Sequence, residues 1–172
     1  MRKFRLYFDK DTEQDWIMEM SNQGWAFQTF FLGVYTFKAS EPGEYTYQID
    51  LLDDWTGDKK DFSEFMEDSG VEVVAQWYRW VYLRKKTVDG PFEMYTDIES
   101  KIMQYKRIKN FFSIALILEF IIFIVEFMAA IRTRKTIFVI ITILIGLIVF
   151  ILFHNVLKCK EKIGELENGY TL

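Results

Sequence analysis

The sequence has little of what metal sites, disulfides and most catalytic centres are built from. Among 172 residues it holds one cysteine, Cys159, and one histidine, His154. A single cysteine can form neither an intramolecular disulfide nor a cysteine-based zinc site. A phosphate-binding glycine loop, a His-Glu-x-x-His helix, a Gly-x-Ser-x-Gly turn and a Cys-x-x-Cys pair are all missing. We therefore expect no cofactor, no metal and a non-enzymatic protein.

Positive charge is also scarce in the N-terminal part. Residues 1–95 hold 11 Lys and Arg against 18 Asp and Glu, a net charge of −7, whereas residues 96–172 hold 10 against 7. Affinity for nucleic acid comes mostly from cations that neutralise phosphates. This imbalance argues against nucleic acid as a partner.

What the sequence has in abundance is apolar residues near its C-terminus. Residues 111–131 and 136–157 form two apolar runs separated by only four residues. A helix needs roughly 20 mostly apolar residues to cross a bilayer, and both runs are long enough. The sequence predicts a two-helix transmembrane hairpin, with the lipid bilayer as its first partner.

The orientation of this hairpin follows from the flanking cations. Three cations lie in the short turn, Arg132, Arg134 and Lys135, against seven on the side of the two termini. These seven are Lys101, Lys106, Arg107, Lys109, Lys158, Lys160 and Lys162. Because residues 1–9 contain no apolar core of a signal peptide, we expect a multi-pass protein of the cell membrane with both termini in the cytoplasm.

The residues before the membrane predict an α+β head. Alternation predicts strands over 2–8, 25–38, 45–52 and 71–83, and short amphipathic helices end near Gly24 and Gly70. This order, βαββαβ, is that of ferredoxin-like domains, with both helices on one face of an antiparallel sheet. The predicted organisation is a head at 1–88, a linker and juxtamembrane helix at 89–110, the hairpin at 111–157 and a cytosolic tail at 158–172.

One face of the predicted sheet would carry aromatic side chains and a cation. The residues concerned are Arg5, Tyr7, Tyr45, Tyr47, Tyr78, Trp80 and Tyr82. Such a surface can contact another subunit or the juxtamembrane helix, can consist of scattered surface aromatics, or can bind a small aromatic molecule in a pocket. The sequence leaves these alternatives open.

Two carboxylates lie inside the first apolar run. Glu119 and Glu126 are seven residues apart and therefore share nearly the same helix face. An ionised carboxylate at the bilayer centre is disfavoured by roughly 2.5 to 3.5 kcal/mol, so we expect both to face protein or water. The alternatives are a seam between copies of the chain, a cation of another membrane protein, or a proton or ion path.

A third acidic group is the cluster Asp50, Asp53, Asp54 and Asp58. It lacks the alternating ligands and the bidentate Glu of an EF-hand loop. We interpret it as a solvated loop and not as a metal site.

Several motifs of the head resemble one bacterial family. They are Lys3-Phe4-Arg5, Trp16-Ile17 with Met20 and Gly24-Trp25, Tyr35-Thr36-Phe37, and Glu41-Pro42-Gly43-Glu44-Tyr45 with Tyr47, Ile49 and Asp50. Over about residues 2–85 the chain is similar to domain-of-unknown-function family 2812. The resemblance implies a small membrane protein, commonly encoded beside PadR-type regulators, in an inducible envelope-response system. We expect a membrane-anchored binding or regulatory module; the alternatives are an accessory transporter subunit and an enzyme or binder of an aromatic compound.

Overall fold

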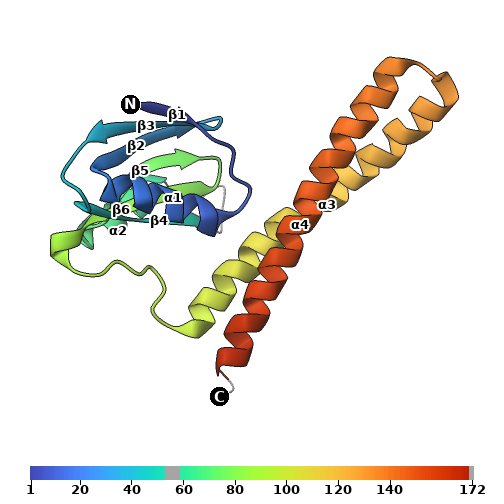
Figure 1. Cartoon of the computed structure of the whole chain (residues 1–172). Coiled ribbons are helices and arrows are strands. Elements are labelled where there is room, and N and C mark those ends of the chain that lie inside the picture. Colours follow the sequence, from blue (N-terminus) through green and yellow to red (C-terminus); the bar gives the residue numbers. More distant parts are fainter. Residues whose placement is uncertain (53–58, 171–172) are drawn as a thin grey trace. The chain divides into compact units, whose positions relative to one another are not determined.

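The computed structural model describes residues 1–52 and 59–170. The chain divides into two units, Met1–Thr96, here called the head, and Asp97–Leu172, here called the helical hairpin. Figure 1 labels their elements.

Over residues 1–52 and 59–96 the head forms two three-stranded antiparallel sheets. The first, sheet A, has the strand order β1-β3-β2, and the second, sheet B, has the order β4-β6-β5. The strands are β1 (Arg2–Phe4), β2 (Trp25–Phe31), β3 (Val34–Ala39), β4 (Tyr45–Leu51), β5 (Glu72–Trp77) and β6 (Trp80–Lys86). Helix α1 (Lys10–Asn22) follows β1, helix α2 (Lys59–Asp68) follows β4, and a short 3-10 turn (Thr87–Asp89) follows β6. Strands β2 and β5 run next to each other where the sheets meet.

The head is a tandem repeat of one strand-helix-strand-strand unit. An offset of 46 residues relates β2, β3 and α1 to β5, β6 and α2: the β-bulge between Phe27 and Thr29 in β2 recurs between Val73 and Ala75 in β5. The pairing of β1 with β3 and that of β4 with β6 differ from this offset by one residue. Phe27 pairs with Phe37, and Val73 pairs with Leu83, at the same offset. The helices repeat as well, since an aromatic residue, Met and Gly occur four residues apart at 16, 20 and 24 and again at 62, 66 and 70. The fold is therefore two copies of one βαββ unit.

The α+β class is confirmed, but the ferredoxin-like topology is not. Each of the predicted strands 25–38 and 71–83 is in fact a hairpin, closed by the two-residue turns Leu32-Gly33 and Tyr78-Arg79. Leu32 and Tyr78 adopt left-handed backbone conformations, with φ of 45° and 58°. Apolar and aromatic residues rarely do so. The Tyr78-Arg79 turn therefore carries little sequence signal, whereas in the Leu32-Gly33 turn the glycine, with a φ of +80°, is the one signal. The described residues of the head form six strands in two sheets, where four strands in one sheet were expected.

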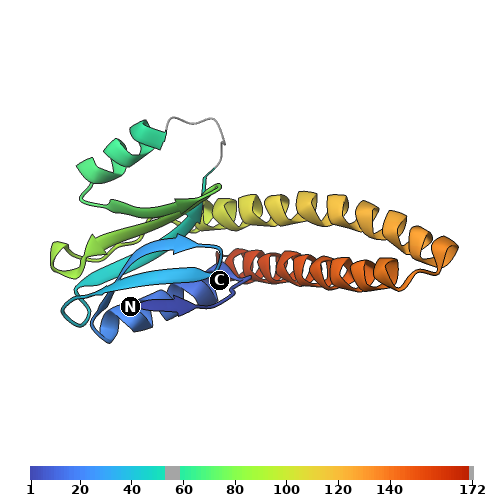
Figure 2. The same cartoon turned by 90° about the horizontal axis from the view of Figure 1, so that it is seen from above.

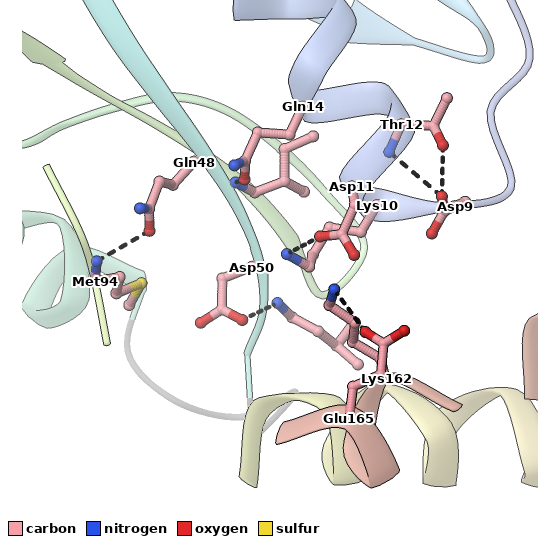
Figure 3. Close-up of polar contacts among 12 residues, drawn as sticks. Asp9, Lys10, Asp11, Thr12, Gln14, Gln48, Asp50, Met94, Lys162 and Glu165 are labelled. Atoms are coloured by element: carbon pink, nitrogen blue, oxygen red, sulfur yellow. Dashed lines mark hydrogen bonds and ion pairs between the residues drawn. The ribbon is translucent and has the colours of Figure 1, made fainter. Parts of the chain in front are cut away.

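Helix α1 begins at Lys10, directly after its cap. Asp9 is the N-cap, and its Oδ2 accepts hydrogen bonds from the backbone N and the hydroxyl of Thr12 at 3.4 and 2.5 Å (Figure 3). The helix stops at Gly24, which has a φ of +81°. That stop agrees with the predicted helix end near Gly24.

The main core of the head lies between α1 and the two sheets. Its buried residues come from α1, from β2 and β3 of sheet A, and from β4 and β6 of sheet B: Trp16, Ile17, Met20, Phe27, Tyr35, Phe37, Tyr47, Ile49 and Tyr82. A second core joins Met66 of α2 to Val71, Val81 and Leu83. Helices α1 and α2 therefore cover opposite faces of sheet B (Figure 2).

The geometry of the Leu32-Gly33 turn predicts that a side chain at position 33 destabilises the head. Gly33 has a φ of +80°, and a Cβ there would lie 2.9 Å from Leu6 Cδ2 and 3.0 Å from the carbonyl oxygen of Arg5. At Gly70, φ is +71° but nothing lies within 4 Å of such a Cβ. A left-handed alanine costs about 1 to 2 kcal/mol by itself, so we expect that loss for Gly70→Ala and a larger one for Gly33→Ala. Equal losses in denaturant titrations would show that the contact with Arg5 and Leu6 has no effect.

The helical hairpin consists of two long antiparallel helices that pack along their length (Figure 1). They are α3 (Ile98–Thr133) and α4 (Thr136–Tyr170). Asp97 caps α3 by accepting a hydrogen bond from the backbone N of Ser100 at 2.7 Å, and this bond lowers the pKa of its carboxyl. Both helices are long and apolar enough to cross a membrane, and they contain the two predicted spans. Residues 158–170, predicted as a tail, continue α4 as helix.

Candidate functional site

A connected group of aromatic rings fills the core where the two repeats meet. We call Tyr7, Trp16, Phe27, Phe30, Tyr35, Phe37 and Tyr82 the aromatic cluster. Tyr35 lies edge-on to Trp16 at 4.9 Å between ring centroids and also contacts Phe30 at 4.8 Å. Tyr82, from the second repeat, contacts Phe27 at 5.3 Å and Phe30 at 5.5 Å. Such contacts add to the stabilisation from burial and hold the two sheets against each other.

A single carboxylate from α1 is inserted into this cluster. Glu13 Oε1 accepts hydrogen bonds from the hydroxyls of Tyr35 and Tyr82, at 2.6 and 2.7 Å. Burial raises the pKa of Glu13 above its ordinary value of 4.5, although the two phenols partly oppose this by stabilising the charged form. Burial, together with the nearby carboxylate, raises the pKa of both tyrosines. Both tyrosines therefore remain hydrogen-bond donors at neutral pH.

This raised pKa predicts a pH dependence of stability. The folded head binds the Glu13 proton more tightly than the unfolded chain does. Protonated Glu13 therefore contributes most to the free energy of unfolding below pH 4.5, and this contribution is lost as the pH rises through the folded-state pKa. Glu13→Gln keeps an oxygen acceptor for both tyrosines but cannot ionise. We expect the variant to lack this decline, seen as a flatter free energy of unfolding between about pH 4.5 and 7. Parallel pH profiles for the two proteins would contradict the assignment.

At the rim of the cluster a cation packs on an aromatic ring. The guanidinium of Arg5 lies 4.8 Å from the centroid of the Trp16 ring and donates a hydrogen bond to the Tyr7 hydroxyl at 2.8 Å. Tyr7 in turn contacts Trp16 at 5.5 Å. Arg5 is exposed and Tyr7 half-buried, so this rim is the part of the cluster that solvent and partners can reach.

A second cation lies where β6 of sheet B approaches β2 of sheet A. Arg84 forms a bidentate ion pair with Glu72, with hydrogen bonds of 2.8 and 2.9 Å, and its guanidinium lies 4.5 Å from the Tyr45 ring centroid. Arg84 also donates to the carbonyl oxygen of Phe27 at 3.3 Å, which joins β6 to β2. Its ion pair with Glu72 raises its pKa despite partial burial. This arrangement fastens the two repeats together.

The structure distributes the seven residues of the predicted aromatic surface over three environments. Tyr47 and Tyr82 are buried in the main core, and the Tyr47 hydroxyl accepts a hydrogen bond from the backbone N of Phe27 at 3.0 Å. Tyr7, Tyr45 and Trp80 pack partly buried against that core. Arg5 is exposed at the rim, and Tyr78 is exposed at the β5-β6 turn. The reason is that α1 covers the sheet face that carries Tyr47 and Tyr82.

Sequence reasoning missed the two residues that carry the polar centre of the cluster, Glu13 and Tyr35. Glu13 stands three, four and seven residues before Trp16, Ile17 and Met20, which places it on the apolar face of α1. The signal in the sequence that could have identified Glu13 is an acidic residue on the apolar face of a helix. Tyr35 lay within a strand whose inward face could not be assigned while the turn at Leu32 was unrecognised.

Asp50 has a different environment from the solvated loop to which it was assigned. It lies in β4 with 2% exposure, and its Oδ2 accepts a hydrogen bond from the Tyr95 hydroxyl at 2.7 Å (Figure 3 shows its position). Nearby, Gln48 binds the segment after β6 by accepting from Met94 N at 3.0 Å and donating to the Phe92 carbonyl at 2.8 Å. Asp53, Asp54 and Asp58 lie outside the described residues. Asp50 thus helps to hold residues 92–95 against sheet B.

Glu119 and Glu126 lie on α3 and are both half-buried. Gly146 of α4 lies against Phe123, since a Cβ there would be 3.2 Å from the ring. In an antiparallel pair this places Glu126, three residues beyond Phe123, opposite the turn of α4 that contains Thr142. Within the part of the chain that the structure describes, Glu126 Oε2 is buried without a hydrogen-bond partner. Thr142 donates instead to Phe138 of its own helix, at 2.8 Å.

These features define the class: a tandem-repeat α+β head joined to two helices that are long and apolar enough to cross a membrane. The chain belongs to the family described as proteins of unknown function, DUF2812, with a match over residues 9–117. That match begins at the cap of α1 and ends within α3, and it confirms the resemblance seen in the motifs of the head. Neither the curated proteins nor the solved structures contain a match.

Proposed function

We propose that the protein is a membrane-anchored, non-enzymatic binding module. The observation that carries this proposal is the surface of α3 and α4: 21 large apolar side chains between Ile114 and Leu157 are exposed. Soluble proteins rarely expose contiguous apolar patches of more than a few hundred Å², and bilayer lipid is the environment that removes this cost. The hairpin is the anchor. Both termini, and the seven cations that lie on the same side of the hairpin as the termini, are on the cytoplasmic side.

The head is the binding part. Support comes from the rim of the aromatic cluster, where exposed Arg5 and half-buried Tyr7 lie over the buried Trp16. Arginine and aromatic residues beside a rigid core are the usual anchors of protein contacts. We assign the rim to an effector or protein partner of an inducible envelope response, in line with the gene neighbourhood that the family resemblance implies.

Photocrosslinking in the native membrane tests the binding role. A photoreactive phenylalanine analogue replaces Tyr7 in the full-length protein, and the matched control carries it at Val88, which is 89% exposed in the same unit. We expect a discrete adduct from position 7 that is lost with Arg5→Ala and is absent from position 88. The same adduct pattern at both positions, or none at position 7 under inducing conditions, would contradict the proposal.

A second candidate function is that of an accessory subunit of a membrane transporter. The observation that favours it is the buried, unpartnered Oε2 of Glu126, because carboxylates at membrane depth commonly bind a cation or a proton. Replacing Glu119 and Glu126 together by Gln keeps their volume and removes the charge. A transport phenotype that survives this change would exclude the role.

A further inference from the structure

The outer face of sheet A is an exposed apolar surface that the proposed function does not use. The other face of this sheet packs on α1, where Tyr35 and Phe37 are buried against Trp16. On the outer face Phe4 is 66% exposed, Phe31 64% and Val34 37%. Large exposed apolar side chains are unremarkable singly, but a contiguous group indicates an interaction surface.

The strand register shows that these residues are contiguous. Val34 is paired with Phe4 of β1 on one side and with Phe31 of β2 on the other, and paired residues point to the same face of a sheet. The β2-β3 turn extends the group, since Gly33 lies against the side chains of Leu6 and Phe4. We call Phe4, Leu6, Phe31, Leu32 and Val34 the sheet A patch, and its two residues outside the strands, Leu6 and Leu32, are 62% and 59% exposed.

The charge around this patch is opposite to that of the rest of the head. Residues 1–8 and 24–40, which contain all of sheet A, hold four cations and no Asp or Glu, although the head as a whole is strongly acidic. Arg2 and Lys38 alternate with the patch along β1 and β3 and thus share its face. Both are exposed. The other two cations, Lys3 and Arg5, point toward Met20 and Trp16 of α1.

We propose that the sheet A patch docks on an anionic lipid surface. Apolar side chains flanked by cations, with no carboxylate among them, complement a leaflet whose headgroups are negative and whose interior is apolar. A second copy of the chain fits less well, because two-fold pairing of these faces would oppose Arg2 and Lys38 to cations of the same kind. The inference rests on the proposed membrane anchor only in that the anchor keeps the head near a bilayer.

The test uses the full-length protein reconstituted in vesicles. Cys159→Ser removes the native cysteine, and Leu32→Cys introduces a site for an environment-sensitive fluorophore. The matched control is Val88→Cys, which lies in the same unit but outside sheet A. The vesicles contain phosphatidylcholine alone or with about one third phosphatidylglycerol, and some contain brominated lipid as a quencher.

We expect the label at position 32 to shift its emission to shorter wavelength in anionic vesicles, with at least roughly two-fold stronger quenching than at position 88. The shift should disappear in about 0.5 M salt and with Arg2→Glu and Lys38→Glu combined. The five tryptophans all lie before residue 97, so their fluorescence verifies that the variants remain folded. Equal responses of the label at positions 32 and 88 would overturn the proposal. A response at position 32 that depends on the density of protein in the vesicles and not on lipid charge would also overturn it, and would indicate contact with a second copy of the chain. Failure of the protein to stay in the vesicles would instead overturn the membrane anchor.

Discussion

Replacing Phe27 by alanine is expected to destabilise the head by about 3 to 5 kcal/mol. Phe27 is fully buried, and its ring contacts Tyr35, Phe37, Tyr47 and Tyr82. The contacts with Tyr47 and Tyr82 cross from the first repeat to the second. The loss is therefore expected in one cooperative transition of the whole head, measured by tryptophan fluorescence in a denaturant titration.

Phe31→Ala is the matched control for this change. Phe31 lies in the same strand but is 64% exposed. Its replacement is expected to change the free energy of unfolding by less than about 0.5 kcal/mol, as for surface sites in general. Similar effects of the two substitutions, or a Phe27→Ala head that unfolds in two separate steps, would contradict the joint core.

Replacing Glu13 by alanine is expected to destabilise the head by about 2 to 4 kcal/mol. The substitution removes the acceptor of two buried phenols, Tyr35 and Tyr82, and a buried donor without an acceptor costs about 1 to 3 kcal/mol. Part of this loss is offset at neutral pH, because the carboxylate itself is disfavoured by burial.

Three variants separate the hydrogen bonds of Glu13 from its charge. Asp15→Ala, at an exposed position of the same helix, is expected to have little effect. Tyr35→Phe combined with Tyr82→Phe removes both donors, and in that background Glu13→Ala should cost much less than in the native protein. If Glu13→Ala lowered the free energy of unfolding as much in this double variant as in the native protein, the two hydrogen bonds would not be what stabilises this site.

The sequence predicted elements well wherever a long or strictly periodic pattern existed. The two apolar runs became α3 and α4, and the stripe of Trp16, Ile17 and Met20 became α1. The Tyr78-Arg79 turn was missed because it contains neither glycine nor asparagine, and the Leu32-Gly33 turn was missed because its glycine follows a left-handed leucine. Without those turns, each of the segments 25–38 and 71–83 fits one predicted strand, and the repeat does not show in the predicted order of elements.

The candidate site was predictable only in part, since it depends on which face of each strand α1 covers. Aromatic residues were recognised at the correct positions, but their separation into a buried cluster and a solvent-accessible rim is a tertiary effect. The repeat explains this separation, because α1 of the first repeat packs on both β2 of its own repeat and β4 of the second repeat. Tyr47 and Tyr82 of the second repeat therefore lie in the core formed by the first repeat.

The proposed membrane anchor requires that α3 and α4 cross the membrane and that the head lies in the cytoplasm. Cysteine accessibility in intact cells tests it most directly, with Val88→Cys in the head and Lys135→Cys between the helices, each in a Cys159→Ser background. A membrane-impermeant maleimide should label position 135 from outside and position 88 only after the membrane is opened, while the protein resists alkaline extraction. Labelling of position 88 in intact cells, protection of position 135, or recovery of the protein in the soluble fraction would contradict the claim.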